Sequence, residues 1–409
     1  MKKEYKIRAV TAFLYLCPED FSQHGNLETK IQKTAQALCK IVTFLSTSGY
    51  DVQTFRIATN PFKEYLPVAT ESVKLKQCLS QLDSILEAND VQFCSLGNAV
   101  TEYDIDCIPH IISTSHRFSC SADIKSGQDI SMAKSAAECI QKISSLGETG
   151  EYKDKHHVMR GLGNFQFCTV SCCKPFMPFF PAAKSCSQEE TIIPFALGLE
   201  NGELAYNLLR EAGSIDNIPT IFKNGMSEAL LEVVKDCKQA EMMYSDTVHF
   251  VGVDTSLNPS LEPNGSIAAA IENIDIVEQF GGRGTIAVAA AITDCLKTLP
   301  GVPTTGYCGL MLPVCEDQRL ACLASNGDLD TTKLLAISSV CGVGLDTIPV
   351  PGDASINELM GIILDVASLS HRYNKSLSCR VFPCPGLKSG DEAKFNSPYM
   401  CDCKVLRLS

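Results

Sequence analysis

Residues 338–353 read SSVCGVGLDTIPVPGD, and this stretch decides how the chain is interpreted. The apolar run LLAISSV at 334–340 leads into it and predicts a buried strand, whereas SINELMGIILDVASLSHRY at 355–373 has the spacing of a helix. The intervening loop carries a cysteine, two carboxylates, glycines and prolines. Loops at the C-terminal ends of strands carry the ligand sites of many α/β proteins. The stretch therefore predicts a site, without identifying a reaction.

The alternation of strand and helix extends along the chain. Apolar runs predict strands at 6–16, 51–59, 91–97, 165–172, 249–257, 307–315 and 377–385. Helical spacing occurs between them, at 27–50, 70–88, 130–146, 202–212, 225–240, 266–279, 284–299 and 317–326. Strands that alternate with crossover helices predict an α/β fold with a mostly parallel sheet or barrel.

The expected organisation of the 409 residues is a single domain, 1–409, with an exposed excursion around 147–157. That excursion, GETGEYKDKHH, is the most polar connection in the chain. Two half-domains that meet there are the alternative.

Charge and hydropathy restrict the partners. With 47 acidic and 35 basic residues, the net charge is -12, which disfavours nucleic acid and suits a protein that handles small molecules. The sequence has no 18-residue apolar run, and AVTAFLYLC near the N-terminus is interpreted as the first strand rather than a signal peptide. We expect a cytoplasmic protein without a membrane partner, and leave self-association as a homo-oligomer open.

The 21 cysteines are interpreted mainly as small buried side chains in a reducing compartment. The exceptions are the adjacent pair Cys172 and Cys173, and Cys401 with Cys403, which lack the CxxC spacing of a zinc site. No HxxxH or HxH pair occurs, and no nucleotide-binding motif is present. No cofactor is predicted, although a magnesium or calcium ion held by carboxylates remains an alternative.

Polar residues follow several expected strands in the last 160 positions. Asp254 ends the strand HFVGV and is a candidate acid or base, with turn formation or helix capping as an equal alternative. Glu316 and Asp317 follow GLMLPVC, and because adjacent side chains point in different directions, at most one faces a site while the other caps the next helix. Helix capping by both, with neither facing a site, is an equal alternative.

The turn GGRGT at 281–285 opens an alanine-rich helix and is a candidate anion site. Glycines allow close approach of a ligand, and a helix N-terminus offers free N–H groups. A close-packed turn with a threonine cap is the alternative. The candidate substrate-binding residues of this turn are Gly282, Arg283, Gly284 and Thr285.

The stretch at 338–353 and the strand after it supply further candidates. Asp346 and Asp353 are the preferred acid/base residues, because prolines and a glycine stiffen the approach to Asp353. Capping of the following helix is the competing use of Asp353. Cys341 is a candidate nucleophile against a background of inert cysteines. Arg380 and Lys388, in SCRVFPCPGLKSGDEAKF, either bind an anionic substrate or pair with the carboxylates.

Several of these motifs together resemble a bacterial and archaeal family of unassigned activity, domain of unknown function 711, also known as uncharacterised protein family 0210. They are VGVDTSLNPSLEPNGSIAAAIE, GTIAVAAAITDCLK, GYCGLMLPVCED, SSVCGVGLDTIPVPGD, LSCRVFPCPGLKSGDEAKF and FCTVSCCKPFMPFFPAAK. The resemblance is dense from about 160 to 400 and thin before that.

The resemblance implies a closed ten-stranded β/α barrel similar to pyruvate formate-lyase-like folds, with two five-stranded parallel halves antiparallel to each other. Arg380 and Val381 are followed by PheProCysPro rather than by a glycyl radical loop, so radical chemistry is not expected. The chain also departs from the family pattern, with Arg283 in place of an expected proline, and Lys184 and Ser185 in place of a Tyr-His pair.

Two functions are therefore considered. The first is an enzyme of non-redox acid/base chemistry, such as hydrolysis, elimination or isomerisation, that acts on a small anionic metabolite in the barrel interior. The second is a non-catalytic ligand-binding or regulatory protein. Convergence of Asp254, Asp346 and Asp353 would favour the enzyme, and their separation would favour binding.

Overall fold

A nine-stranded sheet organises the chain, in the strand order β7-β6-β1-β2-β3-β4-β5-β9-β8. The computed structural model describes residues 3–68, 73–146, 162–188, 192–395 and 397–408. The strands of this sheet are β1 (Lys6–Leu14), β2 (Phe55–Thr59), β3 (Cys94–Ala99), β4 (Phe118–Asp123), β5 (Phe167–Ser171), β6 (Ile193–Glu200), β7 (Val248–Asp254), β8 (Gly344–Pro351) and β9 (Leu377–Cys384). A second, small sheet pairs β10 (Glu392–Ala393) with β11 (Cys403–Lys404).

The large sheet contains two groups of parallel strands. Strands β1 to β5 are successive parallel neighbours, and β6 pairs with β7, and β8 with β9, in parallel as well. The two groups meet in antiparallel pairs, β1 with β6 and β5 with β9. At one end of the sheet, the first residues of β1–β5 therefore lie beside the last residues of β6–β9. At the other end, the last residues of β1–β5 lie beside the first residues of β6–β9.

Residues 304–313 lie between the two edge strands of this sheet. Val253 of β7 forms a parallel bridge with Thr304, and Pro313 forms another with Asp346 of β8. Between them, Met311 N donates to Leu257 O at 2.9 Å. These contacts are isolated bridges and not a continuous ladder, so the ten strands expected from the sequence are not confirmed: the large sheet of the described chain has nine.

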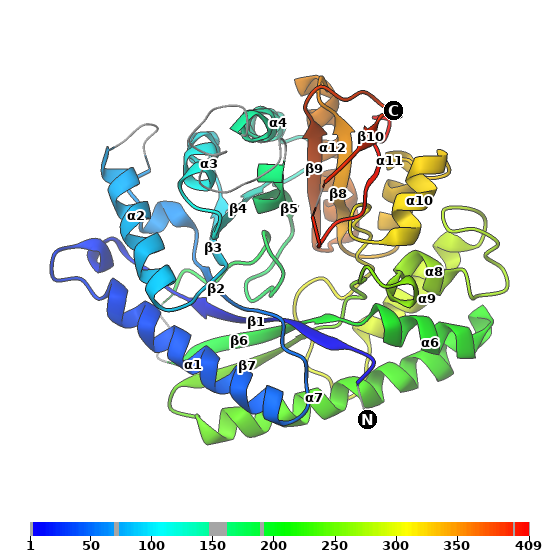
Figure 1. Cartoon of the computed structure of the whole chain (residues 1–409), viewed down its shortest axis with the longest axis horizontal. Helices are drawn as coiled ribbons and strands as arrows, with labels where there is room; N and C mark the ends of the chain where they lie inside the picture. Colours follow the sequence, from blue (N-terminus) through cyan, green and yellow to red (C-terminus); the bar gives the residue numbers. More distant parts are fainter. Residues whose placement is uncertain (1–2, 69–72, 147–161, 189–191, 396, 409) are drawn as a thin grey trace.

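Helices lie around the outside of the sheet (Figure 1). On α1, Ile31, Leu38, Ile41 and Leu45 are buried at helical spacing and form the face that packs inward. The helices of the described chain are α1 (Leu27–Thr47), α2 (Val73–Ala88), α3 (Glu102–Thr114), α4 (Ile130–Ser145), α6 (Gly202–Ala212), α7 (Lys223–Met243), α8 (Ile267–Ile271), α9 (Thr285–Lys297), α10 (Gln318–Asn326), α11 (Thr331–Ser338) and α12 (Ile356–Tyr373).

The prediction of a strand at 334–340 is wrong, because helix α11 contains most of that run. The Asp330 carboxylate caps this helix by accepting a hydrogen bond from Lys333 N at 2.8 Å. The strand begins later, at Gly344, within the stretch that the sequence analysis interpreted as a loop. Asp346 therefore projects from a strand, whose backbone holds it more rigidly than a loop would.

Other sequence predictions are wrong in extent. The helix expected at 266–279 ends at Ile271, and turns follow it. Strands β4 and β6 and helix α3 were not predicted. The excursion expected at 147–157 lies outside the described residues. Within the described ranges, no helix combines the length and the apolar character needed to cross a membrane.

Candidate functional site

The loop at 172–186 packs against the inner face of the sheet. Thr11 Oγ1 of β1 donates to Pro178 O at 2.8 Å, and Ser95 Oγ of β3 donates to Ala183 O at 2.6 Å. From the other side, Thr305 Oγ1 donates to Phe176 O at 2.9 Å. Because two strands of the β1–β5 group and the segment at 304–313 bond to one loop, the sheet curves around it, and the loop fills part of the interior.

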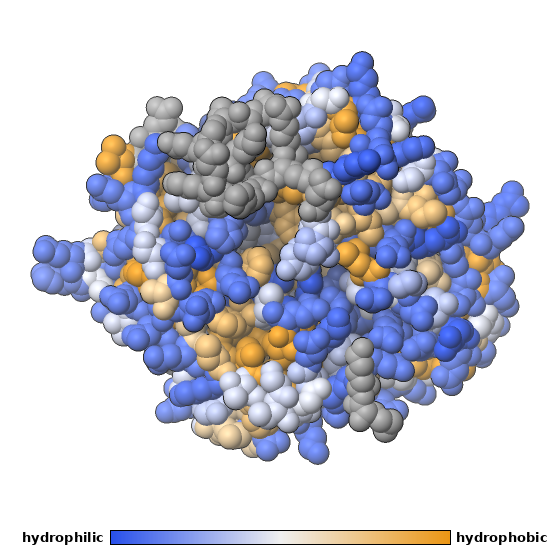
Figure 2. Space-filling model, in the orientation of Figure 1, coloured by the Kyte–Doolittle hydropathy of each residue, from blue (hydrophilic) through white to orange (hydrophobic). Residues whose placement is uncertain are grey.

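A cavity of about 710 Å³ borders this loop. It lies at the end of the sheet where β1 to β5 begin and β6 ends, and loop residues 258–262 and 397–400 also line it. Figure 2 shows a hollow near the centre of the drawn face, where hydrophilic and hydrophobic residues adjoin. The volume and the mixed lining are typical of sites for small molecules. The lining of the cavity includes Lys6, Arg8, Gln53, Arg56, Phe93, Ser119, Phe165, Cys168, Phe179, Phe180, Glu200, Met311, Glu316, Asp346 and Arg380.

Two of the cavity's cations share one carboxylate. Lys6 Nζ lies 3.2 Å from Glu200 Oε1, and Arg8 Nη1 lies 3.5 Å from Glu200 Oε2. Gln53 joins them, since its Oε1 accepts from Arg8 Nη1 and its Nε2 donates to Glu200 Oε2, both at 2.9 Å. This cluster retains an excess of positive charge at neutral pH.

Arg56 is a buried cation without an acidic partner. It is 9% exposed, and its guanidinium carbon lies 5.1 Å from the ring centre of Phe93 and 5.3 Å from that of Phe180. Its Nε donates to Thr54 Oγ1 at 2.9 Å, and no carboxylate of the described residues forms an ion pair with it. Burial, and then the charge of Arg8, lower its pKa to about 9. The two rings stabilise the cation, whose terminal nitrogens remain available to an anion.

Arg380 holds two carboxylates in the same cavity. Its Nε donates to Asp346 Oδ1 at 2.6 Å, and its Nη2 lies 3.3 Å from Glu316 Oε1. The Phe165 ring lies 4.6 Å from the guanidinium carbon. Burial raises the pKa of Glu316, with Asp346 adding to that effect and Arg380 opposing it. A carboxyl group with a raised pKa beside a second carboxyl group is an arrangement that acid/base catalysis uses.

Two smaller groups also belong to the polar lining. The Ser119 hydroxyl is buried and has no hydrogen-bond partner in the described part of the chain. Cys168 is buried near Arg380, and burial raises the pKa of its thiol despite that positive charge. Ser119 can therefore bind a ligand, whereas Cys168 is a neutral thiol at ordinary pH.

Of the three candidate aspartates, only Asp346 lines the cavity. Asp254 is fully buried and accepts hydrogen bonds from Ser256 Oγ at 2.6 Å, Tyr307 N at 2.9 Å and Cys308 N at 3.0 Å. A Cβ on Gly306 would lie 2.1 Å from Asp254 Oδ2, so the turn requires glycine. The Asp254 carboxylate thus attaches residues 306–308 to β7, and burial raises its pKa while these hydrogen bonds oppose the shift.

Asp353 and Lys388 are exposed and do not line the cavity. Asp353 precedes α12, whose N-cap is Ser355; the Ser355 hydroxyl accepts from Glu358 N at 3.2 Å. The alternative that Asp353 caps this helix is therefore wrong. Lys388 contributes its backbone N–H to Asp391 Oδ2 at 2.7 Å.

Cys341 is 1% exposed and does not line the cavity. Burial raises the pKa of its thiol to about 11, although the charge of Lys375 opposes the shift. Its carbonyl oxygen accepts a hydrogen bond from Lys375 Nζ at 2.5 Å. The Lys375 ammonium group therefore binds the backbone carbonyl oxygen of Cys341.

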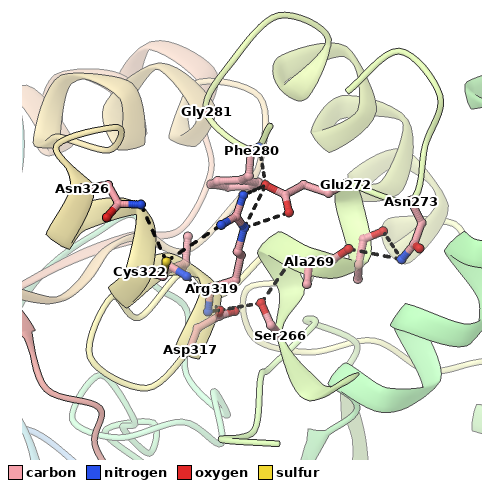
Figure 3. A network of polar contacts seen from close by, with 12 residues as sticks. Ser266, Ala269, Glu272, Asn273, Phe280, Gly281, Asp317, Arg319, Cys322 and Asn326 are labelled. Atoms are coloured by element: carbon pink, nitrogen blue, oxygen red, sulfur yellow. Dashed lines mark hydrogen bonds and ion pairs between the residues drawn. The ribbon is translucent and has the colours of Figure 1, made fainter. Parts of the chain in front are cut away.

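The turn 281–285 lies apart from the cavity, and none of Gly282, Arg283, Gly284 and Thr285 lines it. Gly281 N donates to Thr285 Oγ1 at 3.1 Å, and Arg283 is exposed. The N-cap of α9 is Gly284, which forms no side-chain cap hydrogen bond, so the expected threonine cap is wrong. Figure 3 shows the adjacent polar network, in which Glu272 accepts from Arg319 Nε at 2.8 Å and from Phe280 N at 2.8 Å.

Asp317 belongs to the same network and joins two helices (Figure 3). It accepts from Ser266 Oγ at 2.6 Å and Ile267 N at 2.8 Å at α8, and from Arg319 N at 3.0 Å at α10. The prediction that one member of the acidic pair caps the following helix is thereby confirmed for Asp317, and Glu316 lines the cavity.

The most informative residues that the sequence analysis did not select are Lys6, Arg8 and Arg56. Each is a cation inside an apolar strand, where a charged side chain needs a partner or a ligand, and that was the available signal. Within the described residues, no group of three or more His, Cys, Asp or Glu side chains is arranged to hold a metal ion.

Comparison with known proteins identifies the class. The chain belongs to the family described as Uncharacterised ACR (DUF711), whose model matches residues 1–396. A UPF0210 protein of Clostridium beijerinckii is 25% identical over 424 residues, which cover 96% of this chain and 89% of the relative. One of Lactiplantibacillus plantarum is 37% identical over 155 residues, covering 37% of this chain and 34% of the relative.

Proposed function

We propose that the chain is an enzyme that binds a small anionic metabolite in this cavity and performs non-redox acid/base chemistry on it. Arg56 binds the anion, and Glu316 and Asp346 transfer protons. The proposal rests on the buried Arg56 guanidinium, which has no acidic partner among the described residues and lines the same cavity as the two carboxylates. A buried cation without a counter-ion is costly unless a ligand supplies the charge.

The proton-transfer roles follow from the environments of the carboxylates. Glu316 has a raised pKa, so its protonated form persists closer to neutral pH and can act as a general acid. Asp346 accepts a 2.6 Å hydrogen bond from Arg380 Nε, which fixes the position of its carboxylate for the role of base. Asp254 is assigned a positioning role, because it holds the segment that leads to Tyr307 and Glu316.

A non-catalytic binding protein is the second candidate. The observation that favours it is the separation of the three aspartates chosen from the sequence, since Asp254 and Asp353 do not join Asp346 at the cavity. Glu316 replaces them as a partner of Asp346 through Arg380, and for this reason we place the enzyme first.

We also infer that residues 304–313 act as a tenth strand and close the sheet into a barrel of the pyruvate formate-lyase-like type. The bridges of this segment to both edge strands support this inference. Slow amide hydrogen exchange at Thr305 and Met311, comparable with that of β7, is expected, because both amides donate to the backbone of the β7 region. Exchange as fast as in surface loops would contradict closure.

Binding is tested by calorimetry with succinate and inorganic phosphate as probes. Arg56→Gln is expected to weaken binding of the preferred probe by about tenfold or more, because it removes a charge-assisted contact. Arg283→Gln removes an equally cationic but exposed side chain away from the cavity, and is expected to leave binding unchanged. Equal affinities in the wild type and Arg56→Gln would remove Arg56 from the site.

Catalysis is tested by following a mixture of carboxylate and phosphate metabolites by proton NMR. Loss of the protonated group in Glu316→Gln, or of the base in Asp346→Asn, is expected to slow turnover by about 10²-fold or more. The matched control is Asp353→Asn, which changes an exposed carboxylate. Binding of a probe through Arg56 without turnover of any component would support the second candidate.

A further inference from the structure

The cavity separates its charges into two regions of opposite balance. In one region, Arg56 has no acidic partner in the described chain, and Lys6 and Arg8 share the single carboxylate of Glu200. Positive charge therefore exceeds negative charge there. An anionic group of a ligand would restore the balance, and the buried Ser119 hydroxyl, which also lacks a partner, is available as a further hydrogen-bond donor.

In the other region the imbalance is reversed. Arg380 is one cation that faces two carboxylates, those of Asp346 and Glu316. With both ionised, this group carries an excess negative charge in a largely buried place, where the side chains of Asp346 and Glu316 are 14% and 17% exposed. Either a proton on Glu316 or a cationic group of a ligand can compensate that charge.

The two regions act on one another. The charges of Glu316 and Arg380 contribute to the pKa of Arg56, which places all three in one electrostatic neighbourhood. A ligand in a cavity of about 710 Å³ can therefore contact both regions at once.

We propose that the ligand of this cavity is an amino-acid-type zwitterion, with an anionic group bound by Arg56 and an ammonium group bound by Glu316 and Asp346. This inference rests on the proposed function and names the charge pattern of its substrate. A simple dianion fits less well, because its second negative group would meet the two carboxylates.

The remaining lining predicts an apolar body for the ligand. Phe93, Phe165, Phe179, Phe180 and Met311 contribute to the same cavity. Aromatic and thioether side chains favour contact with hydrocarbon over water. The expected ligand thus carries hydrocarbon between or beside its two charged groups.

Four six-carbon probes test this pattern in the wild-type protein by calorimetry: L-norleucine, 6-aminohexanoate, hexanoate and hexylamine. They share a carbon chain and differ only in charged groups. At least one of the two zwitterions is expected to bind about tenfold or more tightly than both hexanoate and hexylamine, because only a zwitterion satisfies both regions.

Variants assign the two ends of the ligand. Arg56→Gln is expected to weaken binding of the zwitterion and of hexanoate, but not of hexylamine. Glu316→Gln is expected to bring the affinity of the zwitterion down toward that of hexanoate. Arg283→Gln and Asp353→Asn, which change exposed charges away from the cavity, are the matched controls. Thermal unfolding of each variant identifies any that do not fold. The comparison of the four probes with the wild-type protein tests the zwitterion inference without the variants.

The outcomes separate this inference from the proposed function. If hexanoate or succinate binds through Arg56 at least as tightly as either zwitterion, the zwitterion inference is overturned while anion binding stands. If neither the zwitterions nor succinate nor inorganic phosphate binds at millimolar concentration, both fail. Tighter zwitterion binding that is equal in wild type, Arg56→Gln and Glu316→Gln would also overturn the inference, since the ligand would then lie elsewhere.

Discussion

Arg380 and Asp346 face one another from adjacent parallel strands, with Arg380 Nε donating to Asp346 Oδ1 at 2.6 Å. Glu316 approaches the same guanidinium from the segment that connects the edge strands of the sheet. One cation thereby ties β8, β9 and residues 304–316 together at the cavity wall.

Arg380→Met is expected to destabilise the protein by about 3–5 kcal/mol at neutral pH, because it leaves two buried carboxylates without a cation. Urea denaturation monitored by circular dichroism measures the change. Arg283→Met, in which an exposed arginine is replaced, should remain within about 0.5 kcal/mol of the wild type. A loss no larger than that of the control would contradict the structural role of Arg380.

Glu316→Gln is expected to change the pH dependence of stability. Because the pKa of Glu316 is raised in the folded state, the unfolded chain loses this proton first as the pH rises. The free energy of unfolding of the wild type should therefore fall, relative to the variant, from about pH 4 upward and level off above the folded-state pKa. Denaturation at a series of pH values measures this difference, and a wild-type free energy of unfolding that rises relative to that of the variant as the pH rises would contradict the prediction.

Asp254→Asn is expected to destabilise the protein by about 3 kcal/mol, since the amide group replaces an acceptor of buried N–H and O–H donors with a donor. Asp353→Asn makes the same chemical change at an exposed position and should cost no more than about 0.5 kcal/mol. Thermal unfolding of the two variants, compared with the wild type, provides the measurement. Equal stability of the two would show that the Asp254 hydrogen bonds contribute little.

Cys341 is expected to resist alkylation in the folded protein, because it is buried and its thiol pKa is about 11. Iodoacetamide at neutral pH should modify the exposed Cys39 and Cys322 first. Peptide mass spectrometry after timed labelling identifies the modified residues. Labelling of Cys341 as early as that of Cys39 would restore it as a candidate nucleophile.

The sequence predicted the order of many elements because their apolar periods are long and clear. It failed at 334–340, where a seven-residue apolar run is compatible with either a strand or a short helix. The Asp330 cap three residues before Lys333 was the local sign of a helix. The strand expected at 307–315 forms isolated bridges and not a continuous ladder.

The candidate site was predicted in part. Pairing of Arg380 with carboxylates was one of the two alternatives predicted, and Asp346 lines the cavity. Arg8 and Arg56 were missed because site residues were expected only at the C-terminal ends of strands. In a sheet of two opposed groups, the same end also contains the beginnings of β1 and β2, and only the long-range register reveals this.

The loop at 172–186 has a consequence for how this protein family could diversify. It forms the floor of the cavity with Phe179, Phe180 and Pro181, yet it is not part of the sheet. Exchange of a few residues in this loop would change the depth of the cavity, while the strands and the charged groups on them keep their positions. A common scaffold could in this way accept substrates of different length without rebuilding its framework.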